Sequence, residues 1–150
     1  MTEFLNNALP DIIMALLLLL LLAAAMTDFR YKAIPWWLGA GGTALGVALH
    51  IWLNELKIWE LLAGLALGGI VMLLSRLTRD GIGFGDGLMV MTTGAFLGIT
   101  GNVVLLGCSF LLSSLAAIFC LVFRKKKRKD TLPFIPFMLG GYVVMLAVFI

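Results

Sequence analysis

Long apolar stretches alternate with short polar segments along the whole chain. Six such stretches occur, at residues 12–26, 36–53, 58–75, 88–99, 103–123 and 134–150. A helix needs about 20 residues to cross the hydrocarbon core of a bilayer, so we expect flanking turns to complete the shorter stretches. Because almost no chain remains for a second domain, residues 1–150 are predicted to form a single domain. The pattern predicts an all-α membrane protein, a bundle of six transmembrane helices.

The composition agrees with this pattern. Hydrophobic residues make up 62% of the chain and charged residues 13%, and the mean hydropathy is +1.10. These values lie far outside the usual range of soluble domains. All but one of the eleven Lys and Arg fall in three tracts between apolar stretches, and this distribution argues against a nucleic-acid partner. Cys108 and Cys120 share one apolar stretch, so they predict neither a disulfide framework nor a zinc site.

The positive charges predict how the bundle is oriented. If six helices alternate in direction, three basic tracts lie on one side of the membrane and Lys57 lies on the other. The tracts are Arg30 with Lys32, Arg76 with Arg79, and the run from Arg124 to Lys129. Cytosolic loops carry an excess of Lys and Arg, so this side is predicted to be the cytosol and both termini to be extracytoplasmic. The run from Arg124 to Lys129 is expected to attract anionic lipid head groups.

Glycines recur at a spacing of four within three of the apolar stretches. This spacing places both members of a pair on one helix face, where two backbones can approach closely. The pairs are Gly42 with Gly46, Gly64 with Gly68, and Gly94 with Gly98. We interpret them as packing positions within the bundle, and docking of a separate helix is the alternative.

Four acidic residues lie on the predicted cytosolic side: Asp28, Asp80, Asp86 and Asp130. A carboxylate near a membrane is costly unless it serves a function, so these acids are candidates for a site, Asp28 and Asp86 among them. Asp28 follows the first stretch, and its alternative role is a polar helix end paired with Arg30 or Lys32. Asp86 lies in residues 81–87, where glycine occupies every second position, and its alternative role is the cap of the next helix. Because glycine is unfavourable inside helices and strands, we expect this run to turn sharply or to lie close to another segment.

The two acids are more informative together than separately. Both are expected at the cytosolic ends of helices in one compact bundle. Two carboxyl groups held close together cannot both ionise, so they share a proton; one can then activate water while the other polarises a carbonyl. This is the arrangement that an aspartic peptidase needs.

Three short motifs carry a resemblance to a known family. Asp28 is followed by Ile34-Pro35, residues 83–86 read GFGD, and residues 132–137 read LPFIPF. In order and spacing these motifs resemble the three signatures of type IV prepilin peptidases, which are GxGD membrane aspartic peptidases, over essentially the full chain. The GxGD element is also similar to that of presenilin-like proteases, but their Tyr-Asp and Pro-Ala-Leu motifs are missing here.

The resemblance implies a membrane aspartic endopeptidase of the prokaryotic plasma membrane. Such an enzyme removes the leader of type IV prepilin-like precursors at the cytosolic face, just before the apolar helix of the precursor. Asp28 and Asp86 are implied to be the catalytic pair, and neither a metal nor another cofactor is expected. The residues implied to shape the site or bind substrate are Gly83, Phe84, Gly85, Pro133, Phe134 and Pro136.

Two positions depart from the family pattern. Trp36 stands where Asn often follows the Ile-Pro pair, and Leu88 stands where Lys is often found two places after the GxGD aspartate. These departures leave the fit of the substrate open. Larger relatives also carry an N-terminal cytosolic region, with cysteine pairs, that methylates the new pilin amino terminus. This chain resembles a short form, so we expect cleavage without methylation and no need for zinc or a methyl donor.

Several alternatives remain open. Asp80 is a rival for the second acid, although Asp-Gly is typical of a turn, and Asp28, Asp80 and Asp86 could together hold a divalent cation. His50, the only histidine, is expected to pack near the outer end of its helix. The alternatives to a peptidase are a small proton or cation transporter that uses the same acids and a catalytically silent membrane protein of a secretion assembly.

Overall fold

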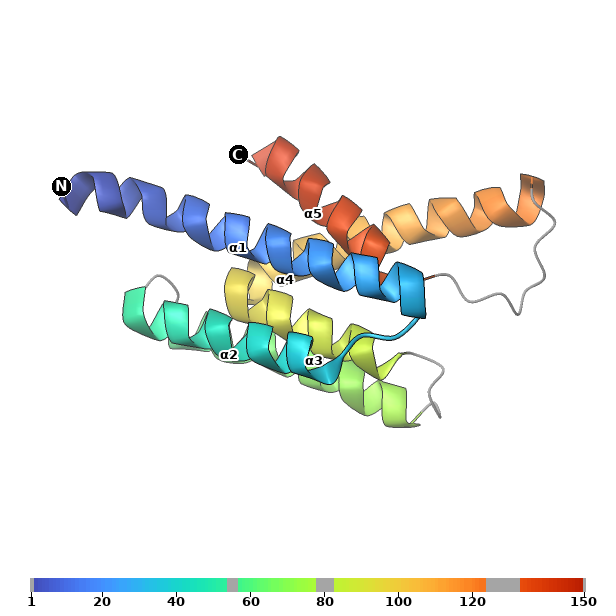
Figure 1. Cartoon of the computed structure of the whole chain (residues 1–150), viewed down its shortest axis with the longest axis horizontal. Coiled ribbons are helices and arrows are strands. Elements are labelled where there is room, and N and C mark those ends of the chain that lie inside the picture. Colours follow the sequence, from blue (N-terminus) through green and yellow to red (C-terminus); the bar gives the residue numbers. More distant parts are fainter. Residues whose placement is uncertain (1, 54–56, 78–82, 124–132, 150) are drawn as a thin grey trace.

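The computed structural model describes residues 2–53, 57–77, 83–123 and 133–149; the side chains of 2–9, 121, 123 and 149 are excepted. Over these ranges the chain forms five helices and no strand (Figure 1). The helices are α1 (Thr2–Tyr31), α2 (Trp36–Leu53), α3 (Ile58–Leu77), α4 (Phe84–Phe123) and α5 (Ile135–Phe149). The prediction of an all-α protein is confirmed for this part of the chain.

α4 is interrupted at Gly98. The backbone there has φ 67° and ψ −173°, a conformation that is open almost only to glycine. Asn102 Nδ2 donates a hydrogen bond to the carbonyl oxygen of Val90 over 3.0 Å, whereas 12 residues of straight helix would separate these residues by about 18 Å. The two segments of α4, residues 84–97 and 99–123, therefore fold back on each other (Figure 1).

The prediction of six transmembrane spans is not supported. Three of the described helices are long and apolar enough to cross a membrane, over Pro10–Tyr31, Ile58–Leu77 and Phe84–Cys120. The last of these contains the break at Gly98, and both the fourth and fifth predicted stretches lie within the same helix, α4. α5 has 15 residues, a length of about 22 Å, which is shorter than a hydrocarbon core of about 30 Å. Helix lengths therefore support neither six spans nor the extracytoplasmic location of both termini.

The first segment of α4 packs on α2 and α3 through glycines. On α2, the missing side chain of Gly42 leaves room for Thr92, and that of Gly46 leaves room for Phe96. On α3, Gly64 packs directly on the backbone of Gly94. The interpretation of these glycines as packing positions is confirmed, but Gly94 and Gly98 do not share a helix face, because Gly98 breaks the helix.

α1 and α5 form the other side of the core. Leu17 and Leu21 of α1 are fully buried, as are Met138 and Tyr142 of α5. The hydroxyl of Tyr142 also donates a hydrogen bond to the main-chain oxygen of Met14 over 3.0 Å. This hydrogen bond and the shared apolar core attach α5 to α1.

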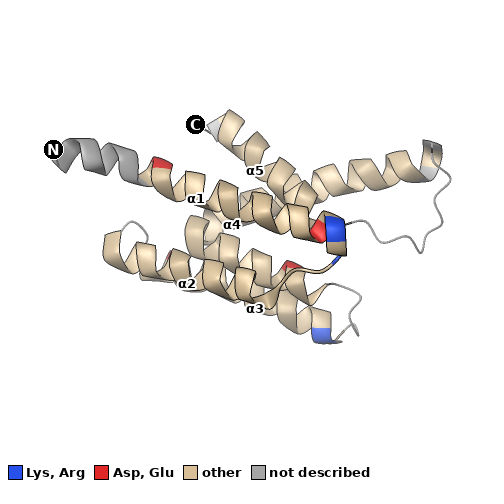
Figure 2. Ribbon diagram, viewed as in Figure 1, with Lys and Arg blue, Asp and Glu red and all other residues tan. Residues whose placement is uncertain are grey.

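Several helix termini lie at one end of the molecule. α1 and α3 end there, and α4 and α5 begin there (Figure 1). Arg30 lies in the last turn of α1 and Arg76 in the last turn of α3, and Figure 2 shows basic residues at this end of the bundle. The candidate acids belong to the same set of helix termini.

The glycine contacts make a prediction about stability. A Cβ at Gly68 would collide with the backbone of Met91, whereas a Cβ at the adjacent Gly69 would meet nothing within 4 Å. We expect Gly68→Ala to lower the free energy of unfolding by about 1 to 3 kcal/mol through overpacking. Gly69→Ala should leave it unchanged or raise it by up to about 1 kcal/mol, because alanine favours the helix.

Thermal unfolding midpoints of both variants in detergent, measured beside the parent protein, check this expectation. Equal midpoints for the two variants would show that the contact between α3 and α4 does not limit stability.

Candidate active site

Asp28 lies in the last turn of α1, and not after the helix as the sequence predicts. The helix continues to Tyr31, and the N–H of Lys32 donates to the carbonyl oxygen of Asp28 over 2.8 Å. Lys32 has a φ of 49°, which is the left-handed conformation common at helix ends. The Asp28 side chain is only 7% exposed, whereas Arg30 and Lys32 are exposed. Asp28 is therefore directed into the bundle, and it is not an exposed helix end paired with these basic residues.

The carboxylate of Asp28 is bonded to the start of α5. The main-chain N–H of Ile135 donates to Asp28 Oδ2 over 3.1 Å, in a buried position. The carbonyl of Phe134 accepts the first hydrogen bonds of α5, from Phe137 and Met138. The N–H of Ile135 therefore has no partner within its own helix, and the positive end of the helix dipole favours a carboxylate beside it.

Asp86 lies in the first turn of α4. The carbonyl of Gly83 accepts the N–H of Asp86 over 3.0 Å and that of Gly87 over 3.4 Å, so the helix begins at Phe84. Residues 84–87 are helical, although glycine is unfavourable within a helix. Their position at the helix start also brings the Asp86 carboxyl group to the positive end of the α4 dipole.

The glycines of this turn allow close approach, as predicted. A Cβ at Gly85 would come within 3.0 Å of the Ile34 side chain, and a Cβ at Gly87 would come within 2.9 Å of the backbone nitrogen of Met72. Gly85 therefore packs on the segment between α1 and α2, and Gly87 packs on α3. These contacts offset the cost of placing glycine in a helix, which is about 0.5 to 1 kcal/mol for each residue.

The structure brings Asp28 and Asp86 together. The two carboxyl groups lie close enough for a direct Coulomb interaction. One group comes from the end of α1, the other from the beginning of α4, and the start of α5 supplies a hydrogen-bond donor to the first. Their assignment as the catalytic pair stays a prediction that this proximity supports.

The other predicted site residues lie around the same helix ends. Pro136 is in the first turn of α5, and the ring of Phe134 lies 5.3 Å from the ring of Phe110 in the second segment of α4. Pro133 lies two residues before the start of α5. Phe84 is 40% exposed and lines a groove on the α3 side, so its ring does not lie between the two acids.

Some of the sequence-based candidates lie outside the described residues. These are Asp80, with the cation site that it would complete, and the run from Arg124 to Lys129. Among the described residues, no group of three or more His, Cys, Asp or Glu is arranged to hold a metal ion. His50 is packed as expected: it is buried, and its Nε2 donates to the carbonyl of Phe96 over 2.8 Å.

Sequence reasoning missed two contributors to the site. The first is the N–H of Ile135, which donates to Asp28, and the second is Ile34, which contacts Gly85. Ile135 lies inside the LPFIPF motif, but a main-chain donor leaves no signal in the side-chain pattern. Ile34 was noticed as part of the Ile-Pro pair, without the contact that explains it.

A comparison with protein families decides which family the chain represents. The family model described as the type IV leader peptidase family matches residues 15–150. The chain belongs to this family. Membership in the leader peptidases implies aspartic peptidase activity, and together with the apolar helices it indicates a membrane-embedded protein. No curated protein and no solved structure shows significant similarity to the chain.

The hydrogen bond from Ile135 to Asp28 is expected to matter for catalysis by this leader peptidase. Ile135→Pro removes the donor, and proline is well accommodated at the first position of a helix. A hydrogen bond to a charged group contributes about 1.5 to 3 kcal/mol, so we expect kcat for leader cleavage to fall about tenfold or more with little change in KM.

Ile135→Val is the matched control, because it keeps the N–H and shortens a fully buried side chain. Steady-state kinetics on a prepilin-like precursor, with unfolding midpoints for both variants, make the comparison. Similar losses of kcat in the two variants would assign the effect to packing of Ile135, and not to its N–H.

Proposed function

We propose that this leader peptidase cleaves the N-terminal leader of type IV prepilin-like precursors, with Asp28 and Asp86 as its catalytic pair. The observation that carries the proposal is the meeting of these two carboxyl groups at the end of the bundle where α1 ends and where α4 and α5 begin. Membership in the type IV leader peptidase family supports the leader peptidase role in general.

The proposed reaction uses one proton shared by the two carboxyl groups. The ionised carboxylate takes a proton from a water molecule, whose oxygen attacks the peptide carbonyl carbon, while the protonated carboxyl group donates its proton to the carbonyl oxygen. The tetrahedral species then collapses: its C–N bond breaks, and the first carboxyl group returns its proton to the leaving amine nitrogen. The second carboxylate recovers a proton from the collapsing hydroxyl group, so the pair ends as it began.

Ile135 positions one partner in this scheme. Its N–H donates to Oδ2 of Asp28 and so restrains the orientation of this carboxyl group. A fixed carboxylate loses less entropy when it aligns with water and the scissile bond, which is how orientation lowers a reaction barrier.

The position of the pair suits a cut at the end of a helix. Both acids lie at helix termini of the bundle and not halfway along a helix. A peptide bond within a helix has its main-chain groups engaged, so a precursor must be extended where it reaches the pair. We propose that the leader and the first residues of the mature precursor are extended at this end, while the apolar helix of the precursor lies in the membrane beside the bundle.

We further propose that this end of the bundle faces the cytosol. Arg30 and Arg76 end the helices that terminate there, and positive charge favours the cytosolic side. In this arrangement the two segments of α4 act as separate crossings, which gives six crossings and extracytoplasmic termini. The membrane must thin locally around α5, which is shorter than the hydrocarbon core.

A transporter is the less favoured function. A proton or cation path needs ionisable groups through the middle of the bundle. The buried polar residues there are neutral and satisfied: Thr93 donates to Asn102 over 2.7 Å, Asn102 donates to the carbonyl of Val90, and Thr92 donates to the carbonyl of Gly39. These threonine and asparagine side chains offer no ionisable group to such a path.

Removal of either acid tests the proposed pair. We expect Asp28→Asn and Asp86→Asn each to lower kcat for leader cleavage by about 10² to 10⁴, the range attributed to general acid–base catalysis. Asp11→Asn is the control, because Asp11 is exposed near the other end of α1, and it should cleave like the parent.

The measurement is cleavage of a prepilin-like precursor by purified protein in lipid, with folding checked for each variant. Full activity in either variant rejects its assignment, and an inactive parent protein favours the silent assembly function. The mass of the product amino terminus shows in the same experiment whether cleavage occurs without methylation.

Cysteine labelling tests the proposed orientation. In a background with Cys108→Ala and Cys120→Ala, a cysteine is introduced at Ala33, just after α1, or at Trp59, in the first turn of α3; both positions are exposed. A membrane-impermeant maleimide added to intact spheroplasts should label Trp59→Cys, and it should label Ala33→Cys only after the membrane is opened. The reverse pattern contradicts a cytosolic site.

A further inference from the structure

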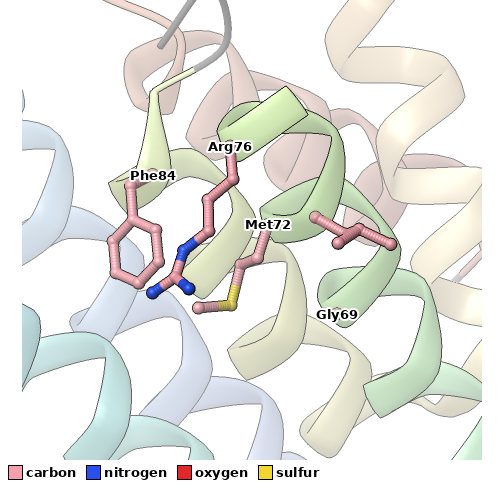
Figure 3. Close-up of a pocket in the computed structure, with 5 residues that line it drawn as sticks. Gly69, Met72, Arg76 and Phe84 are labelled. Carbon is pink, nitrogen blue, oxygen red and sulfur yellow. The ribbon is translucent and has the colours of Figure 1, made fainter. Parts of the chain in front are cut away.

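A groove lies on the outer face of α3, beside the start of α4. Its cavity volume is about 290 Å³, and it is lined by Gly69, Met72, Leu73, Arg76 and Phe84. Figure 3 shows the guanidinium group of Arg76 lying between the ring of Phe84 and the side chain of Met72. The groove is therefore apolar along most of its length and carries one positive charge at the helix end.

The groove is separate from the candidate active site. Phe84 and Asp86 differ by two positions, or about 200° around a helix of 3.6 residues per turn. Gly87 packs on Met72 of α3, whereas Asp86 interacts with Asp28 of α1. The groove and the acids therefore lie on different sides of the first turn of α4.

Gly69 leaves free space in the groove. A Cβ at Gly69 would meet no heavy atom within 4 Å, so this glycine is not required for helix packing, unlike its neighbour Gly68. The surrounding face of α3 is also strongly apolar, since Ile70 and Leu73 are 54% and 59% exposed. On a helix long and apolar enough to span a membrane, such a face contacts acyl chains.

We propose that this groove binds an anionic phospholipid, with its phosphate against Arg76 and an acyl chain over Met72 and Gly69. The groove is charged where the head group of such a lipid would lie and apolar where its acyl chain would lie. Arg76 lies in the last turn of α3, at the depth of head groups, and Gly69 lies two turns farther into the membrane. Among the described residues that line the groove, the only charged side chain is that of Arg76, so an anionic head group is complementary and a basic peptide is not. An arginine also pairs well with phosphate, because its planar guanidinium offers two parallel donors.

Filling the groove is the sharpest test. Gly69→Leu places a side chain where the acyl chain would lie, and Gly41→Leu on α2 is a matched control, because a Cβ there also meets nothing within 4 Å. Native mass spectrometry of the full chain in detergent counts the bound lipids as phosphatidylglycerol or phosphatidylcholine is added. We expect Gly69→Leu to bind one phosphatidylglycerol fewer than the parent and Gly41→Leu to bind as many as the parent.

A second variant tests the charge. Arg76→Gln should weaken binding of that phosphatidylglycerol about fivefold, the loss expected for one cation near a membrane surface, and it keeps the proposal testable if Gly69→Leu does not fold. Equal lipid counts in Gly69→Leu and the parent overturn the proposal. Equal binding of phosphatidylcholine also overturns it, because the site would then not select an anionic head group. Displacement of the lipid by inorganic phosphate overturns it as well, because the groove would then be a simple anion site.

Discussion

The arrangement of this bundle depends on two carboxyl groups at one end of an apolar molecule, because their burial must be offset by hydrogen bonds and helix dipoles. Asp28 is almost completely buried, and the start of α5 supplies both a hydrogen-bond donor and the positive end of a helix dipole to it. Asp86 lies at the corresponding end of α4. A buried carboxylate without such partners would destabilise the protein strongly, so α1, α4 and α5 must meet where they do.

Close contacts between backbones provide the space for this meeting. Gly85 and Gly87 allow the first turn of α4 to lie against Ile34 and Met72, and Gly64 allows the same segment to lie against α3 farther along. Since these contacts surround the first segment of α4, the position of Asp86 follows from packing on several sides. The motif around Asp86 therefore combines a chemical group with the small residues that determine where that group lies.

Much of this arrangement could be predicted from the sequence. The apolar stretches predicted a helical membrane protein, the glycine pairs predicted tight packing, and the distribution of the acids placed Asp28 and Asp86 at one end of the bundle. The helical conformation of residues 84–87 could not be predicted, because the cost of glycine is offset by contacts with residues distant in the chain. The N–H of Ile135 was missed because it belongs to the main chain, and six full spans were predicted because hydropathy does not reveal short or broken helices.

The reversal at Gly98 has a mechanical consequence for the depth of the reactive groups. The segment from Phe84 to this turn is about 20 Å long, and α2 and α3 cover it through residues such as Gly42 and Gly64. This segment is a short helix inside the bundle, so its length does not have to match the thickness of the surrounding lipid. We therefore expect the peripheral helices to accommodate thicker or thinner bilayers, while the distance from Asp86 to the turn stays the same.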